Sequence, residues 1–283
     1  MAPSVSLKDH EFHYLRDFVR KHSAIVTAPD AQSSMELKLI AFMRAQKIDA
    51  LSSLLHTLRT QPRSPVTENF LDHMTNNETL FFRDPAFFDA IETGIIPAML
   101  ERRRTTRALK IWSAASSSGQ EIYSLLMLLQ TRFPELDRWD LEVMGSDISE
   151  TMLSRCREGL YSDLEVRRGL PVGYKERFFT PEGRRWRVKA HVRKMVTFRK
   201  INLSIAWPRL PQFDIILLRN VLIYFDQATK QAILRRIRYT LASDGLLALG
   251  GGETALTLDD SLERVRFGTT FVFQKKSFLA QAG

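Results

Sequence analysis

The chain has 283 residues, of which 44% are hydrophobic, and its formal net charge is +9. This length and composition can bury one large core in one or two domains, and the positive charge favours an anionic partner: nucleic acid, a membrane surface or an acidic protein. No apolar run approaches the roughly 18 residues that span a bilayer, and the opening MAPSVSLKDHEF has no apolar signal core. We therefore expect a cytoplasmic protein without membrane insertion.

Cysteine and histidine usage argues against redox and metal chemistry. The single cysteine, Cys156, can form no internal disulfide and has no metal-ligand spacing around it. His10 and His13 have helical spacing, but the sequence contains no H-E-x-x-H motif. We expect no metal site.

Helical patterns fill the first part of the chain. Ser33 and Glu36 offer a capping box, and Leu51 to Leu58 carries leucines at the i, i+3, i+4, i+7 spacing of one helix face. A breaker-rich segment, TQPRSP, precedes another short amphipathic piece. We predict a small all-α N-terminal domain with its linker over residues 1–75.

Strands and helices alternate from residue 76 to the end. We expect strands at Leu109–Trp112, Leu141–Gly145, Phe213–Leu218 and Leu246–Leu249, and helices at Gln120–Phe133, Ile148–Cys156 and Asp226–Leu241. This alternation indicates an α/β fold with a doubly wound, mostly parallel sheet and right-handed crossovers. Residues of about 161–200 break the rhythm with prolines, glycines and short strand patterns, so we predict an inserted small β subdomain within the domain 76–283.

The most informative stretch is Phe213–Asp226, FDIILLRNVLIYFD. Its first six residues are typical of a strand buried on both faces, and Arg219 and Asn220 follow directly, with Tyr224 one turn later. Ligands of open α/β sheets bind beyond the carboxyl ends of the strands. From these residues alone, two interpretations stay open: a recognition site, or a helix cap followed by a packed tyrosine.

A second candidate edge lies after the first strand. Ser113–Gly119, SAASSSG, lets a ligand approach the backbone, but it matches neither G-x-G-x-x-G nor G-x-S-x-G. The helix that follows starts with Glu121, a poor neighbour for a pyrophosphate. Asp147 ends the next strand, where a carboxylate either takes the hydroxyls of a ribose or caps the following helix. A cationic nucleoside without phosphates fits this edge, and S-adenosylmethionine has that chemistry.

Five segments resemble, in order and spacing, the CheR-type chemotaxis receptor methyltransferases. They are Asn76–Asp84 (NNETLFFRD), Ile111–Ser124 (IWSAASSSGQEIYS), Gly145–Ser149 (GSDIS), Lys200–Leu203 (KINL) and Leu218–Asp226 (LRNVLIYFD). The resemblance implies an S-adenosylmethionine-dependent methyltransferase sheet. It also implies O-methylation of protein glutamates, with S-adenosylhomocysteine as product and no metal. The implied partner is the cytoplasmic helical region of chemoreceptors, and we expect a monomer that binds no nucleic acid.

Site residues are carried over by motif. The resemblance assigns donor contacts to Asn77, Thr79, Arg83, Glu121, Asp147, Asn202, Leu203, Arg219 and Asn220. It places Arg83 and Tyr224 near the transferable methyl, which makes them the catalytic candidates. For Phe81 and Phe82 we expect core packing that anchors the segment.

The chain departs from the family pattern at three points. Family members commonly have Glu where Gln120 stands and Pro where Ile122 stands, which leaves Glu121 as the carboxylate for the donor's amino group. The turn Thr180–Arg185 (TPEGRR) is short, whereas members that dock onto a receptor's C-terminal tether peptide have a longer, glycine-rich loop. We therefore predict methylation that is independent of a tether.

Two rival functions come from other classes. A nucleic-acid methyltransferase would explain the positive charge, but base amino methylation usually shows Asn or Asp, two Pro and an aromatic after the fourth strand, where this chain has RNVLIY. A non-catalytic module that binds donor or receptor is supported only by Gln120 and Ile122.

Overall fold

The structure is a computed structural model that describes residues 6–276. Within these residues the chain divides into two compact units. The helical unit comprises the chain up to Asn76 together with Tyr224–Asp226, and the sheet unit comprises Asn77–Ile223 together with the chain from Gln227 onward. Among the described residues, no helix is long and apolar enough to cross a membrane.

The helical unit is built from α1 (Asp9–Ser23), α2 (Gln32–Gln46), α3 (Leu51–Thr60) and α4 (Pro65–Met74). Their apolar faces meet in one core that includes Leu15, Leu39, Phe42, Leu54 and Phe70. The predicted helical character of this region is confirmed.

The predicted capping box at Ser33 and Glu36 is wrong. A capping box would make Ser33 the N-cap, but helix α2 begins at Gln32, and its N-cap, Ala31, lies two residues earlier and makes no side-chain hydrogen bond. The Glu36 carboxylate instead accepts a hydrogen bond from the backbone N–H of Leu7 at 2.8 Å. Glu36 therefore does not cap a local backbone group as the motif suggests, but contacts a residue 29 positions away in the sequence.

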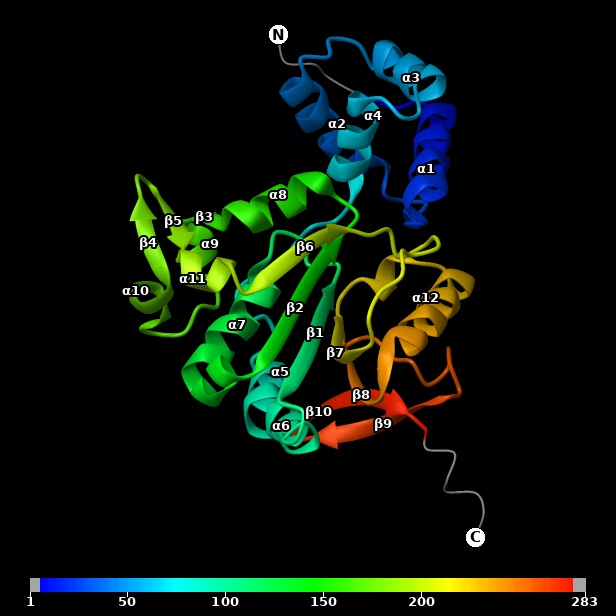
Figure 1. Ribbon diagram of the computed structural model, residues 1–283. Coiled ribbons are helices and arrows are strands. Elements are labelled where there is room, and N and C mark those ends of the chain that lie inside the picture. The colour runs from blue at the N-terminus through cyan, green and yellow to red at the C-terminus, as the bar shows by residue number, and fades with distance from the viewer. Residues whose placement is uncertain (1–5, 277–283) are drawn as a thin grey trace. The chain divides into compact units, whose positions relative to one another are not determined.

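The sheet unit contains a seven-stranded sheet in the order β6-β2-β1-β7-β8-β10-β9 (Figure 1). The strands are β1 (Ala108–Ala114), β2 (Asp140–Asp147), β6 (Val196–Lys200), β7 (Phe213–Leu218), β8 (Leu241–Leu249), β9 (Leu262–Phe267) and β10 (Thr270–Lys275). Strands β6, β2, β1, β7 and β8 pair in parallel, and β10 runs antiparallel between β8 and β9. The predicted doubly wound, mostly parallel sheet is confirmed.

Helices cover both faces of this sheet. Helix α7 (Gln120–Arg132) follows β1 and α8 (Glu150–Glu158) follows β2, and both crossovers step toward the β6 edge. Helix α12 (Gln227–Thr240) follows β7, and its crossover steps the other way, so right-handed connections put it on the opposite face (Figure 1). Every residue of β7 is buried, as its apolar run predicts.

Further short helices share the apolar core between α7 and the sheet. Before β1 the chain forms α5 (Pro85–Ala90), a π-helical turn (Ile91–Ile95) and α6 (Ile96–Arg102), and a 3-10 turn (Pro134–Arg138) follows α7. Their apolar side chains share one core with α7 and the sheet, which includes Phe87, Ile91, Ile122, Leu125, Ile111 and Leu217.

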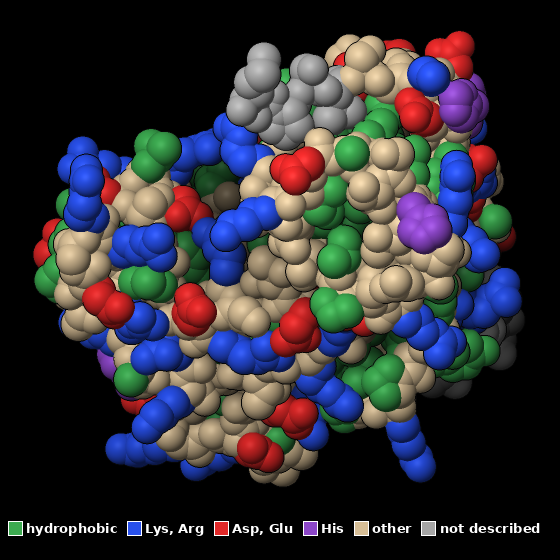
Figure 2. All heavy atoms as spheres, turned by 90° about the horizontal axis from the view of Figure 1, so that it is seen from above, with side chains coloured by type: hydrophobic (Ala, Val, Ile, Leu, Met, Phe, Trp, Pro, Cys, Tyr) green, Lys and Arg blue, Asp and Glu red, His purple; other side chains and the backbone are tan. Residues whose placement is uncertain are grey.

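The insertion between β2 and β6 forms a second, three-stranded antiparallel sheet in the order β3-β5-β4. Its elements are β3 (Leu160–Ser162), α9 (Asp163–Arg167), α10 (Tyr174–Phe178), β4 (Phe179–Glu182), β5 (Arg185–Val188) and α11 (Ala190–Arg193). Figure 2 shows Lys and Arg side chains gathered over this end, to the left of the view, with acidic side chains among them.

The predicted end of the insertion, at about residue 200, is wrong. Val196–Lys200 is β6, which pairs in parallel with β2 at the edge of the large sheet. The crossover from β2 through α8 has to return to that sheet, and the alternation of Val196 and Phe198 suits an edge strand as well as a hairpin strand. The insertion therefore ends before this strand.

Candidate functional site

The carboxyl ends of β2, β1 and β7 lie side by side in the large sheet. Ser113 of β1 pairs with Gly145 of β2 on one side and with Leu217 of β7 on the other. The chain leaves β1 and β7 toward opposite edges, which makes this the switch point at which open α/β sheets form their ligand crevice. This is the position at which the sequence places its candidate residues.

The loop after β1 folds around the Asp147 carboxylate. Positive φ angles recur at Ala115 (64°), Ser117 (49°) and Gly119 (95°), a pattern that turns backbone N–H groups toward an anion. The N–H of Ser117 donates to Asp147 Oδ2 at 2.8 Å, and the Ser117 hydroxyl donates to the carbonyl of Asn77 at 2.7 Å. The small residues of SAASSSG are therefore needed for the shape of the loop.

Asp147 is buried at the last position of β2, with 6% of its surface exposed. Its Oδ1 accepts a hydrogen bond from the N–H of Ser149 at 3.0 Å. The N-cap of α8 is Ser149, whose hydroxyl accepts from Met152 N–H at 3.1 Å. The N-cap of this helix is therefore Ser149 and not Asp147.

Arg219 is the hub of a buried ionic network at the end of β7. Its Nη1 lies 3.0 Å from Glu121 Oε2 and its Nη2 lies 3.0 Å from Asp84 Oδ2, while its side chain is only 2% exposed. The guanidinium carbon lies 3.9 Å from the centroid of the Phe87 ring. Glu121 Oε1 in turn accepts a hydrogen bond from the Ser113 hydroxyl at 3.0 Å. The network joins the ends of β1 and β7, the start of α7 and the segment before α5.

One hydrogen-bond donor of the Arg219 side chain is not used by this network. The Nε of Arg219 is buried and has no hydrogen-bond partner in the part of the chain that the structure describes. A buried cationic donor without a hydrogen-bond partner carries a desolvation cost, and an anionic ligand that accepts its hydrogen bond would relieve that cost.

Asn77, Thr79 and Arg83 lie on the segment that leads into α5. Arg83 is half-buried, and its Nη1 donates to the carbonyl of Glu78 at 3.2 Å. Phe81 and Phe82 anchor the segment as expected: both are buried, and Phe81 packs its ring edge against Tyr161 at 5.0 Å. Thr79 is partly buried on the same segment.

Asn202 and Leu203 follow β6, next to the end of β2. The N–H of Ile201 donates to the carbonyl of Asp147 at 2.9 Å, which brings the two strand ends together. Asn202 Oδ1 accepts from the N–H of Ser204 at 2.9 Å, and Leu203 is buried with 6% exposed. The structure therefore brings these two residues to the same sheet edge as Asp147.

Asn220 and Tyr224 belong to different compact units. Asn220 adopts a left-handed conformation with φ of 56° directly after Arg219. Tyr224 lies in the helical unit, where Asn76 Nδ2 donates to its hydroxyl oxygen at 2.8 Å. Because that contact uses an acceptor position, the hydroxyl proton of Tyr224 stays available to donate.

Gln120 and Ile122, two of the three departures from the family pattern, are both buried in the fold. Gln120 is 2% exposed and its Oε1 accepts from the Ser118 hydroxyl at 2.8 Å, while Ile122 is fully buried. Glu121 between them is the carboxylate of this turn that reaches Arg219.

Two acidic residues of the edge have no assigned role in the sequence-based prediction: Asp84 and Glu253. Asp84 pairs with Arg219, and Glu253, which follows β8, accepts backbone N–H groups of the turn after β7. Glu253 follows a strand of the parallel sheet, where polar groups converge, and that position is a usable signal; Asp84 follows no strand and offers none.

Cys156 is buried under the loop after β1, where its thiol donates to the carbonyl of Ser117 at 3.0 Å. Burial, and after it the nearby Asp147 charge, raises the pKa of the thiol far above its usual range. At pH 8 we expect native protein to react with a thiol-specific reagent about a hundredfold more slowly than urea-unfolded protein, because little thiolate forms. Equal rates in stopped-flow labelling would contradict this placement.

Comparisons with known proteins point to one family. Residues 77–271 match the family described as "CheR methyltransferase, SAM binding domain". The chain is 36% identical over 274 residues to "Chemotaxis protein methyltransferase Cher2" of Pseudomonas putida, covering 94% of this chain and 98% of that protein. It is 35% identical to "Chemotaxis protein methyltransferase 1" of Pseudomonas aeruginosa, covering 96% and 100%, and 31% identical to "Chemotaxis protein methyltransferase" of Escherichia coli, covering 89% and 87%.

The matched region contains the whole crevice, from Asn77 through the strand ends to Glu253. The helical unit is covered as well, because the full-length matches extend over nearly the entire chain. The chain is therefore a member of the CheR family of S-adenosylmethionine-dependent methyltransferases.

Proposed function

We propose that the protein transfers the methyl group of S-adenosylmethionine to glutamate side chains of chemoreceptors, giving glutamate methyl esters and S-adenosylhomocysteine. The observation that carries this proposal is the position of Asp147 and of the Glu121–Arg219 pair at the ends of neighbouring strands of the sheet unit. Those groups suit a ligand with ribose hydroxyls, an ammonium and a carboxylate. The family adds the link to chemotaxis.

The described residues fit S-adenosylmethionine group by group. Asp147 would take the ribose hydroxyls, and Glu121 would hold the α-amino group. The unpartnered Nε of Arg219 would serve the donor's carboxylate, which explains why that nitrogen is buried without a partner. The surrounding contacts would come from Asn77, Thr79, Arg83, Asn202, Leu203 and Asn220. When bound, the donor supplies an electrophilic methyl group on a sulfonium.

The acceptor needs no general base. A glutamate side chain is ionised near neutral pH because its reference pKa is about 4.3. Its oxygen would form the new bond to the methyl carbon as the carbon–sulfur bond breaks, so charge disappears along the reaction. The chain's task is then to bring the two atoms to about 3 to 3.5 Å in line and to exclude water.

Arg83 and Tyr224 would orient the incoming carboxylate. The Arg83 fork can hold both carboxylate oxygens, while the Tyr224 hydroxyl donates one hydrogen bond. An excessively strong clamp would slow the reaction, because it would stabilise the anionic ground state more than the neutralised transition state. A half-buried arginine and a single phenol therefore suit the step.

Tyr224→Phe is expected to lower kcat about three- to tenfold, the effect of one hydrogen bond of about 1 kcal/mol. The Michaelis constant for the donor should stay at the parental value, because the phenol orients the acceptor. Steady-state methyl transfer at saturating S-adenosylmethionine measures both. Parental turnover in Tyr224→Phe would remove this residue from the mechanism.

The proposed tether independence is supported by the short turn of the small β sheet. Strands β4 and β5 pair from Phe179 with Val188 to Glu182 with Arg185, which leaves only Gly183 and Arg184 in the turn. Such a tight turn offers little loop for a docked peptide. Receptor fragments with and without a C-terminal tether peptide are expected to be methylated at equal rates, and a faster reaction on the tethered fragment would overturn this part of the proposal.

The proposed function is tested by titration calorimetry with S-adenosylmethionine, followed by transfer of labelled methyl to receptor cytoplasmic fragments. We expect binding of the donor and labelling of the receptor fragment. Binding without transfer would favour a non-catalytic signalling module. Labelling of duplex DNA in place of the receptor would favour a nucleic-acid methyltransferase.

A further inference from the structure

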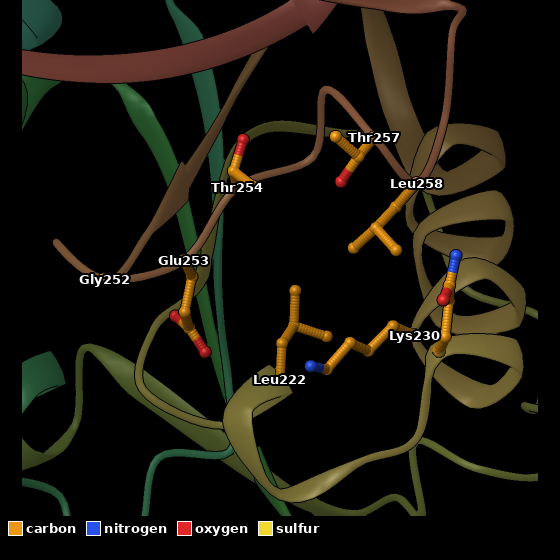
Figure 3. Close-up of a pocket in the computed structure, with 8 residues that line it drawn as sticks. Leu222, Lys230, Gly252, Glu253, Thr254, Thr257 and Leu258 are labelled. Carbon is orange, nitrogen blue, oxygen red and sulfur yellow. The ribbon is translucent and has the colours of Figure 1, made fainter.

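Glu253 places one carboxylate between the ends of two neighbouring strands. Strand β8 ends at Leu249, and after three glycines the Glu253 side chain points back toward the turn that carries Leu222 (Figure 3). Four backbone N–H groups donate to it: those of Asn220 and Gly250 to Oε2, both at 2.7 Å, and those of Val221 and Ile223 to Oε1, at 3.0 and 3.3 Å.

These bonds hold a turn that begins with a left-handed residue. Asn220 has a φ of 56°, a conformation that Asn tolerates better than other residues with a Cβ. The next residues enter the short 3-10 turn Leu222–Tyr224. Because the turn directs its N–H groups to one point, a single ionised carboxylate can satisfy them together.

The packing around Glu253 leaves no room for the turn to shift toward β8. A Cβ added at Gly250 would lie 2.6 Å from Asn220 Nδ2 and 2.7 Å from Glu253 Oε2. On the other side a pocket of about 270 Å³ opens, lined by Leu222, Lys230, Glu253, Thr254, Thr257 and Leu258 among others (Figure 3). Glu253 therefore lies between a tight contact at Gly250 and an open pocket.

We propose that Glu253 is a positioning residue for methyl transfer: its carboxylate holds Asn220–Ile223 in the conformation that sets Asn220 at the donor and presents Tyr224, the next residue. This inference rests on the proposed function for its kinetic part, while the backbone contacts stand by themselves. Glu253 acts through the turn and contacts neither reacting atom.

The first test is amide hydrogen exchange on Glu253→Gln. Glutamine keeps the shape, but one oxygen becomes an NH₂ group that faces N–H donors, so about half of the bonds are lost. We expect the amides of residues 220, 221, 223 and 250 to exchange at least about tenfold faster, as for the loss of a charge-assisted hydrogen bond. Amides of Ile215 to Leu217 in the interior of β7 should keep parental rates.

Glu263→Gln is the matched control. Glu263 lies on β9 of the same unit, where its Oε1 accepts a hydrogen bond from Gln274 Nε2 at 2.7 Å. The same chemical change there should leave the exchange of the turn unaltered. Parental exchange of the turn in Glu253→Gln would overturn the proposal, and so would uniform acceleration along β7, which would indicate a general loss of stability.

Kinetic measurements distinguish a positioning role of Glu253 from a purely structural role. In Glu253→Gln we expect kcat for the receptor to fall about tenfold, because a small misplacement of reacting groups is costly. The donor dissociation constant from calorimetry should rise less than about threefold, since most donor contacts are untouched. Faster exchange with parental kcat would overturn the positioning role. If the parent itself transfers no methyl to receptors, the proposed function fails, but the exchange data still decide whether Glu253 holds the turn.

Discussion

Replacing Arg219 by methionine is expected to lower the free energy of unfolding by about 3 kcal/mol, the cost of breaking a buried ion pair by removing one partner. Methionine keeps the length and apolar stem of the side chain. The loss therefore comes from the carboxylates of Glu121 and Asp84, which lose their cationic partner. Most of the lost free energy of unfolding should come from Glu121, because its side chain is only 16% exposed. The side chain of Asp84 is 39% exposed, so water can solvate its carboxylate.

The same variant should bind S-adenosylmethionine at least about tenfold more weakly, a loss of about 1.4 kcal/mol. Arg219 holds Glu121 in place, and its free Nε is the proposed partner of the donor's carboxylate. Arg219→Lys should lie between parent and Arg219→Met, since an ammonium keeps the charge but cannot fork to two carboxylates.

Arg104→Met is the control for the stability change. Arg104 pairs with Glu101, and both side chains are about three-quarters exposed, at 75% and 76%. Exposed pairs contribute little, so this control should unfold within about 0.5 kcal/mol of the parent. Urea denaturation followed by tryptophan fluorescence gives the comparison. Equal stability of Arg219→Met and Arg104→Met would show that the buried network does not stabilise the sheet unit.

Arg83→Ala is expected to reduce kcat/KM for the receptor at least about a hundredfold, about 2.7 kcal/mol of transition-state stabilisation. The residue is proposed to touch both donor and acceptor, so its loss acts on binding and orientation together. Stability should change little, because Arg83 is half-buried and its described hydrogen bond is to one backbone carbonyl, that of Glu78.

Two further variants make the Arg83 result specific. Arg83→Lys should recover part of the activity through its charge but not the two-point hold on a carboxylate. Arg138→Ala, at an exposed position of the 3-10 turn after α7, removes the same charge from the unit and should leave kcat/KM unchanged. Steady-state transfer of labelled methyl measures all three. An Arg83→Ala enzyme at parental kcat/KM would exclude Arg83 from the site.

The sequence was sufficient for the large elements because their signals are local. The all-buried run Phe213–Leu218 and the leucine spacing of Leu51–Leu58 each follow from the period of one element. The edge strand Val196–Lys200 was assigned to the insertion because a two-residue alternation does not reveal which sheet the strand joins.

The ionic network at the crevice was not predictable in the same way. Arg219 meets Asp84 and Glu121, which precede it by 135 and 98 residues, so no spacing relates them. Glu253 lies 33 residues after Asn220 and contacts backbone atoms, which leave no trace in side-chain patterns. The sequence identifies Arg219 and Asp147 as polar groups because each follows or ends a strand. Their partners depend on the order of the strands in the sheet, which the sequence pattern does not give.

The proposed function predicts a chemically distinctive product. Incubation of a receptor cytoplasmic fragment with methyl-labelled S-adenosylmethionine should give carboxyl methyl esters, which mild alkali hydrolyses with release of labelled methanol. A fragment whose methyl-accepting glutamates are replaced by alanine should stay unlabelled. Alkali-labile label that disappears with those glutamates is the result predicted here; label that survives alkali, or no label on the receptor from a protein that binds the donor, would contradict glutamate O-methylation.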